Sequence, residues 1–524
     1  MFFYLALKRS WRKYLLTKIM LLTISLATAS WAAFNIVDYG ANGDNQTLNT
    51  QAIQAAIDAC ASSGGGTVYV PAGKFLTGTL FLKNNVTLFL EAGAVLLGSP
   101  QLKDYPVTVP ALRSYTDNYT NKSLIYAEKQ HNIALLGGGM IDGQGTAFSG
   151  PYKNRPFILR VIECKNITVR DVSIVNAPMW VQHYLACENV NIDGITVHSH
   201  VNKNNDGIDI DCCQKVRIAN CNINSGDDAI VLKSTSAPLC REITITNCVL
   251  RSRCNAFKLG TESNGGFQNI TLSNCTIYDT RLAGIALETV DGGILDRVNV
   301  SNVTMKNVGG CIFIRLGHRA RKYHQEMEKP PVGVVRNISI SQVQAVGIDS
   351  IGCAITGLPY HPVENVNLNN IRITFRGGGS AELASRKVEE LPDKYPEYNM
   401  FGGLPAYGFY CRHVKNLKFS QVELDFAHPE QRPAFSAEDV HDLTLFDFDA
   451  QLTESTPAMI WLRQVKGAFI HGCRPKNKIN ALIHIEDALT TNVVIMNNDF
   501  SQVKQVVTPG KNANLENTFI ENNR

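Results

Sequence analysis

The sequence predicts an all-β protein, a single-stranded right-handed parallel β-helix with a short capping helix near its N-terminus. Three observations lead to this prediction. A phrase of apolar, polar and apolar residues recurs from Val86 onward, each time followed by a polar pair and a second short strand. Most copies begin 23 to 28 residues apart, and convincing helix patterns are almost absent. A period in the twenties with short strands is typical of a β-helix, and a leucine-rich horseshoe is disfavoured because its Leu-rich consensus is missing.

Residues 1–32 are predicted to form a signal peptide. Basic residues precede an apolar run from Ile19 to Ala29, and Ser30-Trp31-Ala32 offers a cleavage site of the small-x-small type. The apolar run is shorter than the roughly 20 residues that a membrane span requires, which disfavours the alternative of a membrane anchor. We therefore expect a chain that is exported to the periplasm or the medium and has no membrane span after cleavage.

One amphipathic helix is expected close behind this segment. Apolar residues between Ala52 and Cys60 follow the three-and-four spacing of a buried helix face, with Asn49 or Thr50 as a plausible N-cap. Glycines at 64–66 end the pattern. Such a helix would cover the first coil of the solenoid, which otherwise exposes an open end.

The repeated strands predict one β-helix domain over residues 33–524. The first residues of the copies are Ile167, Val190, Val216, Ile243, Ile270, Val298, Ile338, Val366, Leu417, Leu443, Ala468 and Val493. Two intervals, of 40 and 51 residues, exceed the period and predict loop insertions near 317–332 and 377–412. Excess length in a solenoid leaves as loops, commonly on the binding side. The second insertion contains aromatic residues that suit either sugar contacts or packing of the loop itself: Tyr395, Tyr398, Phe401, Tyr407 and Tyr410.

Composition excludes several functions. The formal net charge is +4, with no basic run after the first segment, so we expect no nucleic-acid partner. We also expect a monomer. No CxxC pair is present, and we expect no metal and no cofactor. Of the 14 cysteines, Cys221, Cys248 and Cys275 share an inward position, which favours stacked free thiols over disulfides. Asparagines recurring at one turn position predict a structural ladder: Asn220, Asn247, Asn274 and Asn302.

The acidic residues between Asn204 and Gly260 are the candidates for chemistry. Aligning the apolar residues puts Ile208, Ile230 and Phe257 in one column, and then Asp206, Asp228 and Asn255 stack as well, with Asp227 beside Asp228. Carboxylates one rung apart repel each other and stabilise a fold poorly. Crowded carboxylates do acquire the split pKa values that acid–base catalysis needs. We expect all three aspartates to face outward into an open groove.

These motifs resemble glycoside hydrolase family 28, the polygalacturonase family. The family's Asn-x-Asp-Gly-x-Asp is present as residues 204–209, its Gly-Asp-Asp as 226–228, and the resemblance extends from Phe34 to about Phe500. It implies a pectin-lyase-like solenoid and an inverting hydrolase. In that assignment Asp227 is the general acid, and Asp206 and Asp228 orient and deprotonate the water. Adjacent rungs lie about 4.8 Å apart, closer than the about 6.5–9.5 Å between the acid and base of an inverting enzyme. Asp206 and Asp228 therefore suit one shared water.

Two family motifs are absent. The position of Gly-His-Gly is occupied by Cys254-Asn255-Ala256, and that of Arg-Ile-Lys by Ala286-Leu287-Glu288. In polygalacturonases those cations hold the substrate carboxylate, so their loss and the arrival of Glu288 disfavour plain polygalacturonan. A neutral sugar beside the cut, as in rhamnogalacturonan-type members, is favoured. Lys258 would supply part of the missing charge, and the alternative role for Glu288 is an ion pair with Arg315.

Further site candidates follow from their position in these coils. Trp180 and His183 precede the aspartates and either line the cleft or pack in the core, and an Asp cluster holding Ca²⁺ is the alternative for the acidic residues. The predicted substrate-binding residues are Asn204, Asp209, Asn255, Lys258, Lys233, Glu288, Glu262 and His183.

The sequence thus predicts an exported inverting glycoside hydrolase acting on pectic polysaccharides or oligosaccharides, of rhamnogalacturonan type or exo-acting. Two alternatives remain open. One is a β-helix polysaccharide lyase or epimerase, which would need a uronate neutralised by a metal and an Arg or Lys base. The other is a non-catalytic carbohydrate-binding β-helix.

Overall fold

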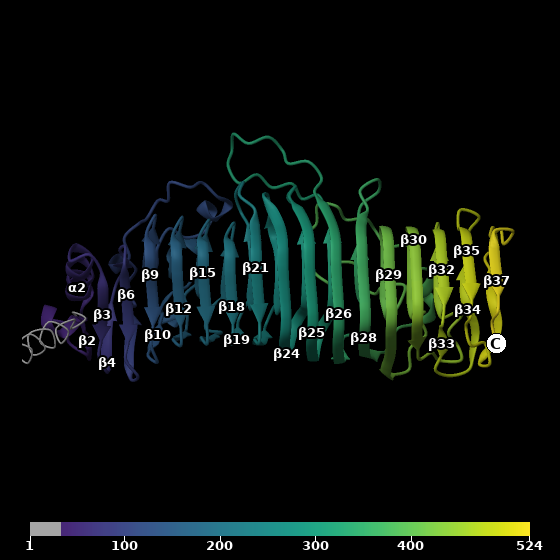
Figure 1. Ribbon diagram of the computed structural model, residues 1–524, viewed down its shortest axis with the longest axis horizontal. Coiled ribbons are helices and arrows are strands. Elements are labelled where there is room, and N and C mark those ends of the chain that lie inside the picture. Colours follow the sequence, from purple (N-terminus) through teal and green to yellow (C-terminus); the bar gives the residue numbers. More distant parts are fainter. Residues whose placement is uncertain (1–32) are drawn as a thin grey trace, which may run out of the picture.

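The computed structural model describes residues 33–524 and confirms the predicted β-helix. All registered strand pairs are parallel, and the strands stack as rungs along one long axis (Figure 1). The predicted signal peptide lies outside the described residues. Among those residues, no helix is long and apolar enough to cross a membrane.

Three ladders of parallel strands form the faces of the N-terminal half. The first contains β1 (Ala33–Asn35), β3 (Gly66–Val70), β6 (Val86–Leu90), β9 (His131–Leu136), β12 (Lys165–Arg170), β15 (Glu188–Asp193), β18 (Gln214–Ala219) and β21 (Cys240–Thr246). The second contains β2 (Asp44–Leu48), β4 (Gly73–Thr77), β7 (Ala94–Gly98), β10 (Met140–Asp142), β13 (Ser173–Val175), β16 (Thr196–Ser199), β19 (Asn222–Ser225) and β22 (Val249–Ser252). The third carries the candidate site and contains β5 (Leu80–Phe81), β8 (Ser123–Glu128), β11 (Phe157–Ile162), β14 (Gln182–Leu185), β17 (Ile208–Asp211), β20 (Ile230–Ser234) and β23 (Phe257–Ser263).

The C-terminal half continues these ladders with longer strands, several of which run around the corners of the coil. They are β24 (Gly266–Thr289), β25 (Ile294–Leu316), β26 (Val334–Ile348), β27 (Cys353–Thr356), β28 (Val363–Gly377), β29 (Phe409–His428), β30 (Phe435–Ala450), β31 (Ile460–Arg463), β32 (Lys466–His471), β33 (Arg474–Pro475), β34 (Ile479–Ile485), β35 (Thr491–Met496), β36 (Val503–Pro509) and β37 (Thr518–Glu521). Short 3-10 helices occupy connecting segments: η1 (Ile36–Tyr39), η2 (Leu102–Asp104), η3 (Tyr115–Asn118), η4 (Gly145–Ala147), η5 (Tyr152–Asn154) and η6 (Ala381–Ser385).

The one α-helix of the described chain, α2 (Thr50–Ser62), covers the N-terminal end of the coil (Figure 1). Its buried residues are Ile53, Ala56, Ile57 and Cys60, the face that the sequence spacing predicts. The helix packs on β1, β3, β5 and β6. The first rung is therefore shielded from edge pairing.

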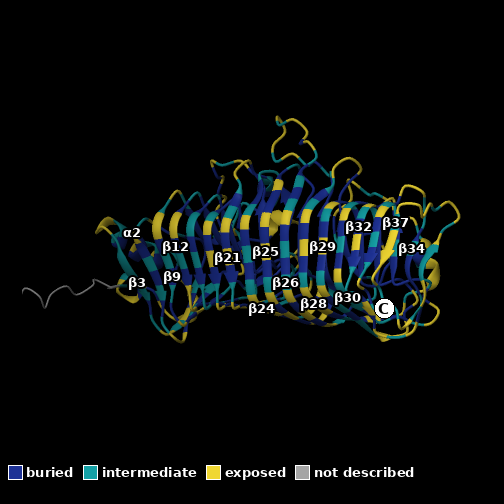
Figure 2. Ribbon diagram, turned by 45° about the vertical axis from the view of Figure 1, so that its right-hand side comes forward, coloured by how far each residue is buried: buried dark blue, intermediate teal, exposed yellow. Residues whose placement is uncertain are grey.

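The interior of the coil is a continuous apolar core, and buried and exposed residues alternate along many strands (Figure 2). All 14 cysteines are free thiols, as predicted for Cys221, Cys248 and Cys275. The asparagine ladder is formed in part. Asn302 Nδ2 donates to Asn274 Oδ1 at 2.8 Å and Asn247 to Asn220 at 3.4 Å, whereas Asn274 donates to Thr246 instead. These asparagines have φ between 53° and 58°, a left-handed conformation that asparagine tolerates.

Irregular segments leave the coil at three places near the third ladder. They are residues 99–122 between β7 and β8, 317–333 between β25 and β26, and 378–408 between β28 and β29. The first of these was not anticipated from the strand spacing. All three contribute side chains to the site described next.

Candidate active site

The apolar register predicted from the sequence is the register of the structure. Ile208 pairs with Ile230 and Ile230 with Phe257, across β17, β20 and β23. The main chain extends this pairing to the preceding residues, since Gly207 N donates to Asp228 O at 2.9 Å and Ala229 N to Asn255 O at 2.8 Å. Asp206, Asp228 and Asn255 therefore lie one above another at the start of three consecutive strands.

Lys233, at the end of β20, lies in a ring of three carboxylates. Its Nζ is 3.7 Å from Asp206, 3.6 Å from Asp209 and 3.6 Å from Glu262. The ammonium also lies 4.8 Å from the centre of the Trp180 ring. Burial opposes the charge of this lysine, but the surrounding carboxylates outweigh that effect and raise the pKa of Lys233. We call Lys233 and its three acidic neighbours the Lys233 ring.

Lys258, one rung further along, has a ring of its own. Its Nζ is 3.5 Å from Asp228, 3.8 Å from Glu288 and 3.5 Å from Glu397, and it donates to Tyr395 Oη at 3.4 Å. Burial again opposes the charge, and the three carboxylates raise the pKa of Lys258. We call Lys258, Asp228, Glu288 and Glu397 the Lys258 ring.

Asn255 fixes Asp228 from a second direction. The main-chain N and the side-chain Nδ2 of Asn255 both donate to Asp228 Oδ1, at 3.0 and 2.8 Å, while Asn255 Oδ1 accepts from Ala283 N. Asn255 is fully buried. At the position where the resemblance places a histidine, this chain therefore has a neutral residue that orients the Asp228 carboxylate.

Asp227 differs from both of its neighbours because it belongs to neither ring. It makes no ion pair within the described residues, and its Oδ1 accepts only from Asp228 N, at 3.0 Å. Asp227 is half-buried, whereas Asp206 and Asp228 are 3% and 4% exposed. Burial and the adjacent Asp228 raise the pKa of Asp227, which favours its protonated form.

Asp206 and Asp228 do not face outward into an open groove as expected, because both side chains are buried among the described residues. Lys233, Lys258 and the loop residue Glu397 surround Asp206 and Asp228, which leaves Asp227 as the more accessible carboxylate. The expectation failed because the strand pattern places side chains on a face and says nothing about the loops above that face.

Glu288 is fully buried, and neither of its side-chain oxygens has a hydrogen-bond partner. The alternative pairing with Arg315 is wrong within the described chain. The two residues are in register, but Arg315 donates to Thr356, Gly357 O, Glu390 O and Leu391 O. Burial is the main cause that raises the pKa of Glu288, opposed by Lys258.

Three other predicted site residues differ in their position relative to the rings. Asp209 of the Lys233 ring is fully buried, and its one ion pair within residues 33–524 is with Lys233. His183 is also fully buried, with Nε2 3.2 Å from Asp211 Oδ2, and burial lowers its pKa. Asn204 is half-buried and accepts from Arg155 Nη2 at 3.0 Å, away from both rings.

The loops supply residues that sequence reasoning missed. Glu262 binds Arg321 of segment 317–333, and its Oε1 also accepts from Tyr119 Oη at 3.3 Å, from segment 99–122. Glu397 of segment 378–408 contacts Lys258 and Asn255. The only sequence signal for these contacts was the excess length of two insertions, which marks a region and not a residue.

Most aromatic residues of the second insertion pack the loop onto the coil. Tyr398, Phe401, Tyr407 and Tyr410 are buried, while Tyr395 is 51% exposed and lies over Lys258 at 5.2 Å. Packing is therefore the observed role of four of the five, and Tyr395 alone offers an open ring beside the site.

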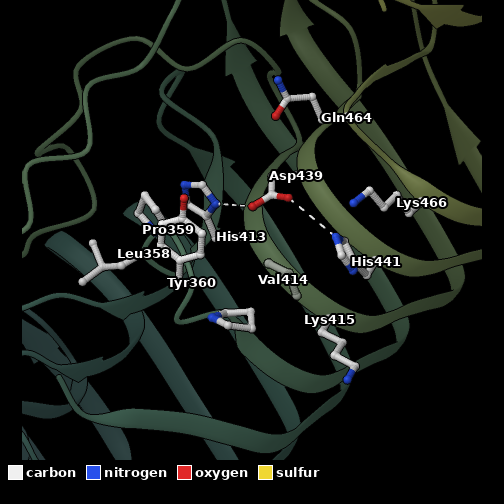
Figure 3. Close-up of a pocket in the computed structure, with 11 residues that line it drawn as sticks. Leu358, Pro359, Tyr360, His413, Val414, Lys415, Asp439, His441, Gln464 and Lys466 are labelled. Atoms are coloured by element: carbon white, nitrogen blue, oxygen red, sulfur yellow. Dashed lines mark hydrogen bonds and ion pairs between the residues drawn. The ribbon is translucent and has the colours of Figure 1, made fainter. Parts of the chain in front are cut away.

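A separate cavity of about 440 Å³ lies further along the coil and contains none of the predicted site residues. Figure 3 shows His413 and His441 on either side of Asp439, with the exposed ring of Tyr360 nearby. This cavity is separate from the acidic site.

Three side chains of the site lie close enough together to be considered as ligands of one metal ion. Asp227, Asp228 and Cys254 each offer one atom within 4.8 Å of the others. Asp228 is already held by Asn255 and Lys258, and two carboxylates with one thiol, without further free oxygen ligands, suit Ca²⁺ poorly.

Crowded carboxylates with raised pKa values on one face of a β-helix are an arrangement suited to acid–base chemistry, as in enzymes of this fold. Comparison with known proteins identifies the family. The model of glycosyl hydrolases family 28 matches residues 60–391, more than half of the chain, and the chain belongs to this family. It is a glycoside hydrolase, so the lyase and non-catalytic alternatives are set aside.

Several known proteins that are similar to this chain are consistent with this family. A probable polygalacturonase of Vitis vinifera is 30% identical over 415 residues, which cover 71% of this chain and 83% of the relative. An exo-poly-alpha-D-galacturonosidase of Dickeya chrysanthemi is 32% identical over 39% of this chain and 42% of the relative. The crystal structure of an exopolygalacturonase from Thermotoga maritima matches the fold with a TM-score of 0.57 at 24% identity, over 65% of this chain and 86% of that one.

Proposed function

We propose that this glycoside hydrolase acts on pectic polysaccharides or oligosaccharides with inversion of configuration. Asp227 serves as the general acid that protonates the glycosidic oxygen. Asp206 and Asp228 hold the water that attacks the anomeric carbon from the opposite face, and Asp228 takes its proton. This assignment is supported because, of these three aspartates, only Asp227 has no lysine partner among the described residues, while Asp206 faces Lys233 and Asp228 faces Lys258.

We propose further that the sugar beside the scissile bond is neutral, as in a rhamnogalacturonan. The observation that carries this proposal is that each lysine of the site already faces three carboxylates. No cation of either ring is free to bind a substrate carboxylate. At about 4 Å, replacing an attractive contact by a like charge costs roughly 1–4 kcal/mol, depending on the local dielectric.

An exo mode of action fits the surroundings of the site. Downstream of Lys258, the same outward column continues through Ala286, Phe313 and Ala354, and loop side chains cover it. The covering residues form one apolar cluster with the column and include Val388, Tyr398, Met400, Phe401 and Leu404.

The upstream side is covered as well. Tyr119 packs against Phe157 and Trp180, and the buried Arg160 donates to Thr120 O at 3.2 Å. An internal stretch of a polysaccharide therefore cannot lie along this sheet face through the site. We propose that the enzyme removes units from a chain end, acts as a monomer, and is exported by the leader at residues 1–32.

The test uses the purified full-length protein and end-labelled oligosaccharides of matched length from homogalacturonan and rhamnogalacturonan. We expect faster cleavage of the rhamnogalacturonan series, one terminal product by mass spectrometry, and an inverted anomer by NMR. Preference for homogalacturonan would overturn the neutral subsite, and fragments of many lengths would overturn the exo mode. N-terminal sequencing of the exported protein checks cleavage near Ala33.

A further inference from the structure

Glu397 brings a carboxylate into the catalytic site from a loop far along the sequence. It lies 142 residues after Asn255, and its Oε2 accepts from Asn255 Nδ2 at 3.3 Å. Its Oε1 lies 3.5 Å from Lys258 Nζ. The side chain is 21% exposed, so it faces the open side of the Lys258 ring, whereas Glu288 closes the buried side.

The partners of Glu397 are also the partners of Asp228. The same Nδ2 of Asn255 donates to Asp228 Oδ1 at 2.8 Å, and the same Nζ of Lys258 lies 3.5 Å from Asp228 Oδ2. Asp228 and Glu397 thus face each other across one ammonium and one amide. A substrate carboxylate approaching Lys258 from the open side would have to take the position of the Glu397 carboxylate.

Contacts of the neighbouring residues anchor the segment that carries Glu397 to the coil. The adjacent Tyr398 is buried and donates to Asp349 Oδ2 at 3.0 Å, and Phe401 packs under the guanidinium of Arg315. Arg432 donates to Leu404 O at 3.2 Å. The backbone of this segment is therefore held close to Lys258, and a competing anion has to displace the Glu397 side chain to reach the ammonium.

We propose that Glu397 is a specificity-determining residue that occupies the anion position on Lys258 and thereby excludes a uronate from the subsite beside Asp228. The proposal rests on the proposed function, because it explains how a neutral sugar is selected there. Removing this carboxylate leaves Lys258 with a vacant position that a uronate carboxylate fits in charge and size.

The test measures kcat/KM of wild type, Glu397→Gln and Glu397→Ala on the two matched oligosaccharide series. We expect the ratio of homogalacturonan to rhamnogalacturonan cleavage to rise at least about fivefold in Glu397→Ala, since like-charge repulsion at about 4 Å is replaced by attraction. Glu397→Gln should give a smaller rise, because the charge is removed while the space stays filled. Glu389→Gln is the matched control: it makes the same change of charge on an exposed residue of the same loop, and its ratio should stay at the wild-type value.

A second measurement separates this proposal from the proposed function. Calorimetry with galacturonic acid and with trigalacturonate on Asp227→Asn and on Asp227→Asn/Glu397→Ala reports binding without turnover. Tighter binding by the double variant supports the proposal even if Glu397→Ala cleaves nothing. Equal binding and an unchanged ratio overturn it, while a wild type that prefers homogalacturonan overturns the proposed neutral subsite instead.

Discussion

The two lysine rings of the site contain the same kinds of groups but differ in the hydrogen bonds that their glutamates accept. In the Lys233 ring, Glu262 also accepts hydrogen bonds from Arg321 Nη2 and Tyr119 Oη, at 2.6 and 3.3 Å. In the Lys258 ring, Glu288 has no hydrogen-bond donor on either oxygen. One ring therefore has a second cation for its glutamate, and the other depends on a single lysine.

The pKa values of the two glutamates follow from this difference. Burial acts to raise both, but Lys233 and Arg321 reverse its effect and lower the pKa of Glu262 to about 2. For Glu288, burial prevails over Lys258, and the pKa is raised well above its ordinary value. The difference is confined to the glutamates, because burial also raises the pKa of Asp206 and of Asp209 in the Lys233 ring, and Asp209 has no hydrogen-bond partner on either oxygen. Both rings therefore contain carboxylates with raised pKa values, an arrangement typical of functional sites.

The largest effect is expected from Asp227, which belongs to neither ring. Asp227→Asn removes the proposed acid, and kcat/KM should fall about 10²–10⁴-fold, the usual contribution of a positioned general acid. Unfolding in urea should be nearly unchanged, since no ion pair is lost. Glycosidase assays and denaturation curves on the same preparation check both points, and wild-type turnover in the variant would remove Asp227 from its role.

Removing each lysine tests whether the rings differ in stability. Lys258→Met leaves three buried or half-buried acids without a cation, and such a loss costs about 3–5 kcal/mol of unfolding free energy. Lys233→Met leaves the buried Asp206 and Asp209 without a cation but should cost less, because Arg321 still neutralises Glu262. Chemical denaturation at pH 7 measures both values. A Lys233→Met variant that is the less stable of the two would show that Arg321 does not make the rings unequal.

The sequence predicted the strands that carry the site but not the loops that cover it. Asp206, Asp228 and Asn255 could be placed in one column because apolar residues alternate with period two on regular turns, which fixes register. Arg321 and Glu397 could not be placed, since loops have no period and therefore no register. The alternative pairing of Glu288 with Arg315 is wrong for a related reason: register brings their main chains together, but carbonyl groups of the loop accept the hydrogen bonds of the guanidinium.

The smallest effects, and the sharpest contrast, are expected from Glu262→Gln and Glu288→Gln. The folded-state pKa of Glu262 lies at about 2, below its ordinary 4.5, so its stabilising contribution is complete above pH 4.5 and is lost as the pH falls toward 2. Glu262→Gln should therefore lower the unfolding free energy at pH 7 by about 2–4 kcal/mol and flatten its dependence on pH below 5.

The folded-state pKa of Glu288 is raised, so its ionisation destabilises the protein as the pH rises above 4.5. Glu288→Gln should therefore be more stable than wild type at pH 7. Urea denaturation of the three proteins at pH 3, 5 and 7 checks the signs, and a shift of both variants in the same direction at pH 7 would contradict the difference between the two rings.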